Sequence, residues 1–403
     1  MTPVVVLGCD SNGYGVIRSV AKFNPSIPII GIDYNANAPG LFSKYLYKKI
    51  IVSDPNKSFE KLLRDFNKLN INLDDKKIKP VVIITSDIFL NFFNSYREIL
   101  SEKFSFNIPD KQLLDNILDK RKQYELIRRL NIETPRTMIV KDINDDLNFD
   151  ELVFPVFVKG AHPHKWKNYF IEKGFVAENK NQLFTIIEKI QKHNLEFIIQ
   201  ELIVGPNKNH YKVSVYYDKN RNPKLFFTTQ KVRQFPYDFG VGSYMRSKRV
   251  EELISLGKKI FDALNYTGIG SIEFKVDERD GKFKFIELNP RMWQQNYQAT
   301  LAGLNFAEYY YKDCIGQETF FNDQFLENVT YIDTVNDFQS FIYNKKITKE
   351  NLFDWIIQVL GADGYAFYEM KDLKPILISS NYGLKNFKYL LKFKRILEGV
   401  KTN

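Results

Sequence analysis

The chain has 403 residues, of which 44% are apolar, so it is long enough for two or more domains with packed cores. The net charge of +10 favours an anionic ligand, but the lysines are scattered without a block of like charge, so we expect no nucleic-acid partner. No apolar run approaches the roughly 20 residues that a membrane span needs, and the first eight residues lack a charged leader, which together predict a cytoplasmic protein.

The first hundred residues alternate strand and helix patterns. Apolar strands are expected at 3–8, 27–32 and 80–85, with a helical pattern after Gly15. This alternation predicts a parallel α/β sheet, whose ligands bind at the carboxyl ends of the strands. The polar residues at those ends are the candidate substrate contacts of this domain: Asp10, Ser11, Asn12, Asp33 and Asp87.

Three glycines invite a dinucleotide-binding interpretation. The spacing of Gly8, Gly13 and Gly15 does not fit G-x-G-x-x-G, which argues against a nicotinamide site. A glycine-rich turn over 10–15 that leads into a helix would leave backbone N–H groups free, so we expect an anion pocket on the substrate side. Cys9 and Cys314 lie far apart without metal-ligand spacing, and we expect both to be core residues.

The middle of the chain begins with a charged helical connector over 111–130 and continues as a mixture of strands and helices. Strands are expected at 136–140, 154–159, 170–177, 197–202, 211–217 and 225–232, and helices at 182–192 and 250–264. A further unit from about residue 322 contains a helix at 350–360 and a strand at 366–368.

The most specific segment is a predicted hairpin over 270–291, with apolar alternation on both sides of a turn at Asp280-Gly281. Glu273 and Glu287 can then lie side by side, and two neighbouring carboxylates repel unless a cation separates them. Magnesium with nucleotide phosphates would satisfy this, because it prefers hard oxygen ligands. Asn289 shares the strand face of Glu287, and Arg291 would follow if the strand continued. The alternative is a surface hairpin whose charges face water.

Three further features suggest a nucleotide site. Lys159 ends an apolar strand, an unusual place for an ammonium group unless it reaches an anion. The strand ending in Glu201 stops at Gly205-Pro206, which would leave backbone groups available to an adenine. Arg233 follows a strand and precedes a glycine-flanked segment suited to a phosphate.

In chain order, these residues resemble the ATP-grasp superfamily of carboxylate–amine ligases over about residues 109–318. The pattern consists of Lys120, Lys159, Glu201, Ile203, Gly205, Arg233, Glu273, Glu287, Asn289 and Arg291. The resemblance implies an α/β (α+β ATP-grasp) fold, with an N-terminal parallel α/β domain, a two-lobed ATP-grasp domain and a small C-terminal unit. The expected divisions are 1–108, 109–195 (connector and small lobe), 196–321 (large lobe with the metal site) and 322–403.

The resemblance also implies roles. Lys120 and Lys159 look like the ATP-phosphate lysines. Glu201, Leu202 and Ile203 look like the adenine hinge, with Asn207 or Asn209 at the ribose. Glu273, Glu287 and Asn289 match the ligands of Mg2+, for which Mn2+ could substitute. Arg233 resembles the arginine beside the transferred phosphate, and Arg291 the one beside the acyl-phosphate; with Lys159 they form the expected catalytic set. Trp293 and Gln294 join the candidate substrate contacts.

The chain departs from the family pattern in the segment 160–172, which is poor in glycine. Its histidine and lysines, His162, Lys165 and Lys167, would hold phosphate with side chains, or the segment would serve the substrate. A metal pair at His162 and His164 is disfavoured, because Pro163 separates them and no third ligand is near.

The implied activity is an ATP-dependent ligase that joins a small-molecule carboxylate to an amine, expected to be an amino acid, through an acyl-phosphate. Within the superfamily the chain looks most like the D-aspartate ligase type, which joins an amino acid to a cell-envelope precursor. Similar enzymes are often homodimers. The alternatives are a bicarbonate-using carboxylase or carbamoyl-phosphate-type enzyme, and a nucleotide-binding protein without catalysis.

Overall fold

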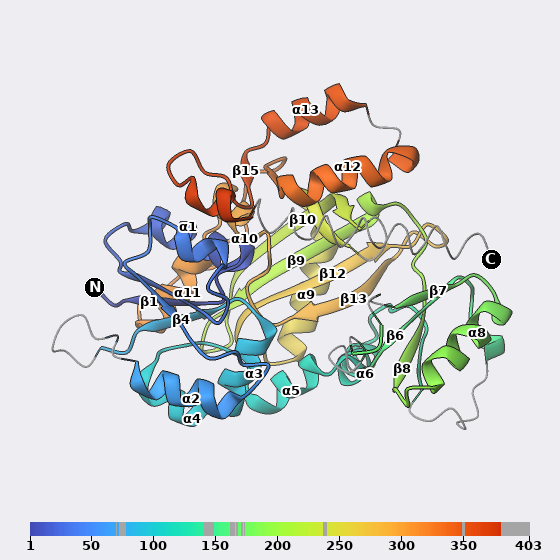
Figure 1. The fold of residues 1–403 in the computed structure, drawn as a ribbon, viewed down its shortest axis with the longest axis horizontal. Coiled ribbons are helices and arrows are strands. Elements are labelled where there is room, and N and C mark those ends of the chain that lie inside the picture. The colour runs from blue at the N-terminus through green and yellow to red at the C-terminus, as the bar shows by residue number, and fades with distance from the viewer. Residues whose placement is uncertain are drawn as a thin grey trace. The chain divides into compact units, whose positions relative to one another are not determined.

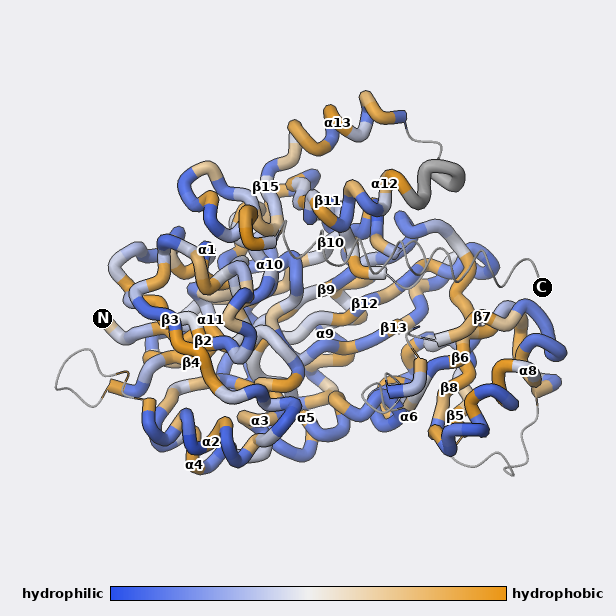
Figure 2. Tube along the Cα trace, in the orientation of Figure 1, coloured by the Kyte–Doolittle hydropathy of each residue, from blue (hydrophilic) through white to orange (hydrophobic). Residues whose placement is uncertain are grey.

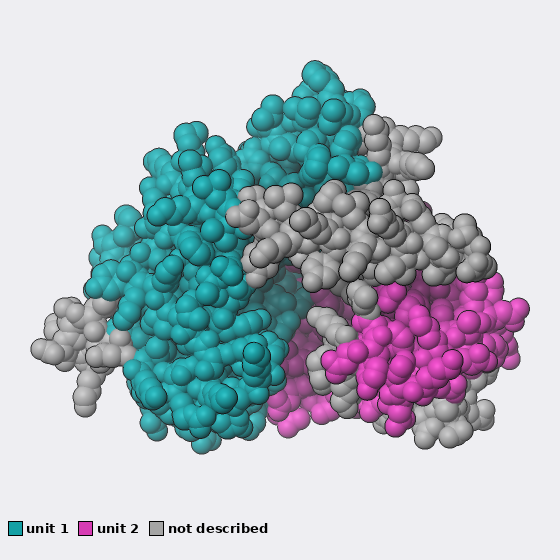
Figure 3. Space-filling view, in the orientation of Figure 1, with its two compact units in different colours: residues 1–111, 213–271, 289–403 teal, residues 112–212, 272–288 magenta. Residues whose placement is uncertain are grey.

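The computed structural model describes residues 1–69, 71, 78–140, 149–161, 166, 168–170, 172, 174–236, 240–348 and 351–379, without the side chains of 151 and 343–348. The chain divides into two compact units (Figure 3). Unit 1 contains residues 1–111, 213–271 and 289–403, and unit 2 contains residues 112–212 and 272–288. Each unit is described by itself.

Unit 1 begins with the expected parallel sheet, in the order β3-β2-β1-β4 (Figure 1). Its strands are β1 (Val4–Leu7), β2 (Ile29–Asp33), β3 (Lys48–Ile51) and β4 (Val81–Ile84). β1 pairs in parallel with both β2 and β4 and is completely buried, as are its two neighbours. Burial on both faces explains the uninterrupted apolar runs of these strands (Figure 2). The helices here are α1 (Ser11–Phe23), η1 (Pro39–Phe42), α2 (Phe59–Lys68), α3 (Asp87–Ser95) and α4 (Arg97–Lys103).

The glycine-rich turn predicted over 10–15 is wrong, because helix α1 already begins at Ser11. Asp10 is its N-cap and accepts a hydrogen bond from the Ser11 N–H. A Cβ atom on Gly13 would lie 1.9 Å from the Gly8 carbonyl oxygen, so glycine is needed there for close packing. Of Gly8, Gly13 and Gly15, Gly8 alone has a positive φ, +86°, and it lies in the turn between β1 and α1. The anion pocket was expected in a loop over these residues, but residues 11–15 are helical.

The largest sheet has the order β13-β12-β9-β10-β11-β14-β15. Its strands are β9 (His210–Tyr217), β10 (Pro223–Phe235), β11 (Val241–Ser247), β12 (Gly268–Val276), β13 (Phe283–Asn289), β14 (Thr330–Ile332) and β15 (Gly364–Tyr365). The remaining helices of unit 1 are α9 (Glu251–Ala263), α10 (Asn296–Leu301), α11 (Phe306–Cys314), α12 (Thr334–Thr348) and α13 (Leu352–Leu360). The prediction of a strand at 366–368 is wrong, because β15 covers residues 364 and 365 and the next two residues form bends. β10 also runs past Val232, so Arg233 lies inside a strand.

Arg18 of α1 is buried and connects the C-terminal part of unit 1 to the N-terminal part. Its guanidinium donates to the carbonyls of Tyr365 and Ala366 at 2.8 and 3.2 Å, and to the Tyr331 hydroxyl at 3.0 Å. The rings of Tyr14 and Tyr297 lie 4.3 and 4.1 Å from it. Carbonyl dipoles and aromatic faces therefore compensate this buried charge.

Unit 2 contains a sheet in the order β5-β8-β6-β7, whose recorded pairs are antiparallel. Its strands are β5 (Thr137–Val140), β6 (Val156–Gly160), β7 (Phe175–Ala177) and β8 (Phe197–Glu201). The helices are α5 (Lys111–Leu118, entering from unit 1), α6 (Lys120–Arg129), η2 (Phe149–Glu151), α8 (Lys180–Gln191) and η3 (Asn207–Asn209). β7 is shorter than the strand predicted at 170–177, of which residues 171 and 173 lie outside the described residues. Trp166 packs in the core cluster of this sheet.

Both cysteines are buried and unpaired, which confirms them as core residues. Among the described residues, no helix has the length and apolar character to cross a bilayer.

Candidate functional site

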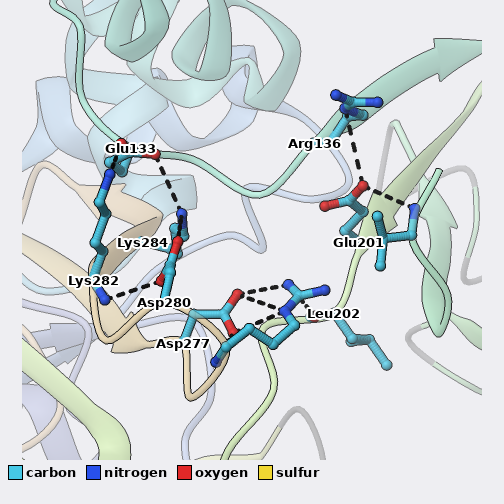
Figure 4. Close-up of polar contacts among 10 residues, drawn as sticks. Glu133, Arg136, Glu201, Leu202, Asp277, Asp280, Lys282 and Lys284 are labelled. Atoms are coloured by element: carbon cyan, nitrogen blue, oxygen red, sulfur yellow. Dashed lines mark hydrogen bonds and ion pairs between the residues drawn. The ribbon is translucent and has the colours of Figure 1, made fainter. Parts of the chain in front are cut away.

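The predicted hairpin of β12 and β13 is confirmed. The Asp277 N–H donates to the Lys282 carbonyl at 3.0 Å, and Gly281 has φ +71°, which glycine adopts without steric cost. Arg279 folds back onto Asp277, and Lys284 pairs with Asp280 and Glu133 (Figure 4). These ion pairs fix the turn end of the hairpin that carries Glu273 and Glu287.

Helix α6 is attached to β13 by side chains on one helical face. The buried Gln123 amide donates to the Leu288 carbonyl at 2.8 Å and accepts from the Leu288 N–H at 3.1 Å. The Tyr124 hydroxyl donates to the Ile286 carbonyl at 2.6 Å. Lys120 lies three and four residues before these two side chains and therefore shares their face. Its ammonium group consequently reaches the Glu287 carboxylate, at 3.4 Å.

Lys159, at the end of β6, joins the same cluster. Its ammonium donates to the Gln200 side-chain oxygen at 3.1 Å and lies 5.5 Å from the centre of the Tyr124 ring. Burial lowers the pKa of Lys159 to about 8; the charge of Lys120 acts in the same direction and that of Glu287 opposes it. Among the described residues, no carboxylate forms an ion pair with Lys159.

Glu273 is paired with Lys212 of β9, at 3.1 Å. Lys212 was not predicted, because it follows His210 and Tyr211 in a strand that is less uniformly apolar than the strand of Lys159. Lys212 is only 7% exposed, so its charge needs the carboxylate. Each of the two expected metal-binding carboxylates therefore has a lysine beside it.

The expected metal ligands are of chemical types that fit a hard cation, with Glu273 and Glu287 in unit 2 and Asn289 in unit 1. Glu273, Glu287 and Asn289 offer two carboxylates and an amide oxygen, the ligand types that Mg2+ prefers. No group of three or more His, Cys, Asp or Glu side chains is gathered among the described residues, and the expected set contains only two of these types. β13 ends at Asn289, so Arg291 does not continue the strand alternation that the sequence analysis considered.

The hinge after β8 uses part of its hydrogen-bonding capacity internally. The Glu201 carboxylate accepts from the Val153 N–H at 3.0 Å and lies 4.0 Å from Arg136 (Figure 4). The N–H groups of Glu201 and Leu202 bond to the carbonyls of Arg136 and Pro155. In the described part of the chain, no backbone bond to Ile203 is recorded. The Ile203 backbone is therefore the part of the hinge best able to bind an adenine edge.

The two ribose candidates lie in the short helix η3. Asn209 donates to Glu278 at 3.4 Å, next to the hairpin turn, and Asn207 is in the first position of the helix. Both residues belong to unit 2, together with Lys120, Lys159, Glu201, Glu273 and Glu287.

Unit 1 contains the remaining candidates. Arg291 forms a two-pronged ion pair with Asp87, at 2.6 and 3.1 Å, so a predicted catalytic residue and a predicted substrate residue contact each other. Asp87 is the first residue of α3, where a negative charge is favoured by the helix dipole.

The strand-end residues of the first sheet have structural partners. Asn12 donates to the Thr85 carbonyl at 2.9 Å, and Asp33 accepts from the N–H groups of Cys9 and Asn35 at 2.6 and 2.8 Å. Burial raises the pKa of Asp33, and these N–H groups oppose that shift. Ser11 is buried at the start of α1, beside its cap Asp10.

Trp293 and Gln294 follow β13 by a few residues. Trp293 is 2% exposed, and its ring packs edge-on against Phe306 at 4.9 Å between centroids. This is the position of a core side chain, so we do not retain Trp293 among the proposed substrate contacts. Gln294 is half-buried and is retained.

Arg233 is held inside unit 1 by Asp337 of α12. Its guanidinium donates to both carboxylate oxygens, at 3.0 and 2.7 Å. His162, Lys165 and Lys167, which were expected to hold phosphate or serve the substrate, lie outside the described residues, as does His164 of the disfavoured metal pair.

Comparisons with known proteins show which families this chain resembles. Residues 119–317 match the family profile of the carbamoyl-phosphate synthase L chain, ATP-binding domain. The chain is 26% identical to a D-aspartate ligase of Enterococcus faecium over 80% of this chain and 78% of that protein. Residues 119–317 form the ATP-grasp domain of a ligase. A D-alanine–D-alanine ligase B of Clostridium tetani is 22% identical over 49% of this chain and 58% of its own length.

The fold of this ATP-grasp ligase is shared with solved structures of low identity. The biotin carboxylase domain dimer of Hydrogenobacter thermophilus 2-oxoglutarate carboxylase has a TM-score of 0.61 at 16% identity, covering 82% of this chain and 73% of that one. That structure contains MgADP, ADP and bicarbonate. ATP-grasp enzymes use ATP with Mg2+, and the mixed α/β fold predicted from the sequence is confirmed.

Proposed function

We propose that this ATP-grasp ligase joins a carboxylate to an amine, with ADP and phosphate as products. The γ-phosphoryl group of ATP is transferred to a carboxylate oxygen, giving an acyl-phosphate. The amine then attacks the carbonyl carbon, and the tetrahedral species expels phosphate while the amine loses a proton. Activation is needed because a free carboxylate is a poor electrophile, whereas phosphate is a good leaving group.

The observation that carries the proposal is the cluster of Lys120, Lys159 and Glu287 in unit 2. It brings two ammonium groups to one carboxylate, and burial, with a smaller contribution from Lys120, lowers the pKa of Lys159. A polyphosphate would supply the negative charge and restore the Lys159 ammonium. Phosphoryl transfer depends mainly on such charge neutralisation and positioning.

Mg2+, or Mn2+ in its place, would be held by Glu273, Glu287 and Asn289 and would neutralise charge on the ATP phosphates. Lys120 and Lys212 hold these two carboxylates before the metal arrives. The protein's own contribution is to keep Lys159 beside the phosphates and Ile203 beside the adenine. On this proposal Arg233 and Arg291 act on the transferred phosphate and the acyl-phosphate.

We propose an amino acid as one substrate, with D-aspartate as the first candidate. The support is the identity of 26% over most of both chains with a D-aspartate ligase. The substrate contacts would come from Asp10, Ser11, Asn12, Asp33, Asp87 and Gln294. We also propose the four-part domain division given above, a cytoplasmic location and a homodimeric assembly, which sedimentation of the purified protein would test.

The second candidate function is carboxylation of bicarbonate. It is favoured by the family profile, which describes a carbamoyl-phosphate synthase domain, and by the bicarbonate in the structure of similar fold. That fold likeness, at 16% identity, concerns architecture only. The D-aspartate ligase match covers more of the chain than the family profile does, so we rank ligation of an amino acid first.

Hydroxylamine trapping separates these functions. Enzyme, Mg2+ and ATP are incubated with hydroxylamine and one carboxylate at a time, because hydroxylamine converts an acyl-phosphate into a stable hydroxamate. We expect hydroxamate and phosphate in equal amounts with the true carboxylate substrate; if D-aspartate supplies that carboxylate, it gives more hydroxamate than L-aspartate does. Phosphate release with bicarbonate but without hydroxamate would favour carboxylation. Tight ATP binding without turnover on any carboxylate would indicate a protein without catalysis.

A further inference from the structure

Asp337 is the centre of a buried polar network that the sequence analysis did not find. It is 0% exposed and lies on α12, in unit 1. Besides the two bonds from Arg233, its carboxylate accepts from the Ser243 hydroxyl at 2.8 Å and from the Trp355 indole N–H at 2.9 Å. A buried carboxylate with four hydrogen bonds, two from a guanidinium, has a fixed orientation.

The strands beneath Asp337 are distorted where they meet it. The register of β10 and β11 shifts on both sides of Arg233, between Lys231 and Arg233 and between Arg233 and Gln234. Arg233 pairs with Tyr244, so Ser243 lies just outside the regular ladder. Bulges redirect side chains, and here both Arg233 and Ser243 meet the same carboxylate.

Helix α13 closes the network through two side chains. Trp355 stacks on Phe341 of α12, with ring centroids 5.3 Å apart, while its indole N–H reaches Asp337. The Gln358 side-chain oxygen accepts from the Nη1 group of Arg233. Arg233 is therefore hydrogen-bonded to side chains of both α12 and α13. It cannot swing away without leaving a charge buried and unpaired, which is strongly disfavoured.

We propose that Asp337 of α12 is a positioning residue for Arg233, and that α13 supports it through Trp355 and Gln358. This inference rests on the proposed function, in which Arg233 acts on the transferred phosphate. Asp337 touches neither ATP nor carboxylate; it sets the direction in which Arg233 presents its charge. The C-terminal helices are then needed for turnover as well as for folding.

The test combines a split of kinetic constants with chemical rescue. For Asp337→Asn we expect kcat to fall by at least tenfold with the KM for ATP changed less than threefold, because orientation is lost rather than nucleotide affinity. Trp355→Phe keeps the ring stack and removes one bond to Asp337, and we expect a smaller fall in kcat. Two controls should leave kcat unchanged: Asp323→Asn, which breaks another arginine pair of unit 1, and Tyr365→Phe, which removes a bond to the α13 backbone.

Rescue by free guanidinium distinguishes positioning from a purely structural ion pair. In Arg233→Ala, guanidinium ions should bind beside Asp337 and restore several-fold activity, whereas in Arg233→Ala with Asp337→Asn they should not. Equal rescue in both backgrounds, or kcat losses that follow only the melting temperature, would overturn the inference. If Glu287→Gln lowers turnover but Asp337→Asn does not, this inference fails and the proposed function stands. If no carboxylate supports ATP turnover in the unaltered enzyme, both fail.

Discussion

At the scale of single residues, the proposed function makes Lys159 a contact for ATP whose charge depends on pH. Its pKa of about 8 means that the free enzyme loses this charge within an accessible pH range. Below pH 8 the ammonium is present and can meet the phosphates; above it, binding must first recover a proton. We expect the KM for ATP to rise above pH 8, by up to about tenfold per pH unit.

Steady-state kinetics between pH 7 and 9.5 will check this expectation. Lys159→Arg should make the KM nearly independent of pH, since arginine stays charged, and Lys159→Ala should raise it throughout. A change at the exposed pair of Lys282 and Glu133, such as Lys282→Gln, should have no effect. The same lowered pKa implies a cost in folding free energy that is present below pH 8 and is relieved as the pH rises toward 10.5. If the KM for ATP depends on pH in Lys159→Arg as it does in the unaltered enzyme, Lys159 is not part of the site.

Glu287 gives a second expectation at this scale. Glu287→Gln removes the charge that holds Lys120 and that would hold the metal, so we expect turnover with Mg2+ and ATP to fall by on the order of a hundredfold, or about 3 kcal/mol of barrier. The melting temperature should change little, because the side chain is partly exposed. Activity within a few-fold of the unaltered enzyme would contradict the metal assignment.

The sequence could predict these residues only in part. Lys159 and Lys212 both interrupt strand patterns, but only Lys159 was predicted. Lys212 follows His210 and Tyr211, so it stands out less from its neighbours than Lys159 does. Asp337 gave no signal: its neighbours in the fold, Ser243 and Trp355, are distant in the chain. The pairing of Arg291 with Asp87 likewise depends on chain folding over long range.

At the scale of elements, the start of helix α12 carries a buried acid. Asp333 is 4% exposed and accepts from the Asn336 N–H at 3.2 Å and side-chain amide at 2.8 Å. Burial raises its pKa from 3.8 to about 6, against these hydrogen bonds. The unfolded carboxyl ionises first as the pH rises, so stability falls between about pH 4 and 6 and the cost persists above.

Asp333→Asn should therefore stabilise the protein at pH 7.5. Asparagine preserves the acceptor at the helix start and removes the charge, so we expect a gain on the order of 2 kcal/mol. At pH 4 the gain should vanish, because the acid is then neutral in the folded state. Urea unfolding at both pH values measures this difference. Equal stability at pH 7.5 would mean that water or a cation compensates the carboxylate.

Element prediction succeeded where the local code is strong. Asp280-Gly281 correctly indicated the hairpin, because the left-handed φ is a local requirement. It failed at α1, since Gly13 suggested a loop while the actual demand was close packing against Gly8, a tertiary contact. It also failed at β15, whose two residues are strand only because β14 lies beside them.

At the scale of the molecule, the C-terminal part of the chain is integrated into unit 1. β15 extends the large sheet, and α12 lies against β10 and β11. The division at residue 322 stays a prediction, and the pairing of β15 with β14 is a long-range contact that composition does not reveal. What the sequence did contain was the ordered series of charged residues, which pointed to the ATP-grasp ligases before any contact was known.

The setting of Arg18 determines how far the chain can be shortened from its C-terminal end. A chain that ends at Ser379 keeps Tyr365 and Ala366, and we expect it to melt as the full chain does. A chain that ends at residue 362 removes two carbonyl acceptors and strands a buried cation, so it should unfold at a lower temperature or be degraded. Arg18→Met in that shorter chain should recover part of the loss, because it replaces the stranded charge with an apolar side chain. Melting temperature and resistance to protease compare these chains, of which the shorter also loses the Asp372 bonds with Tyr14 and Ser43.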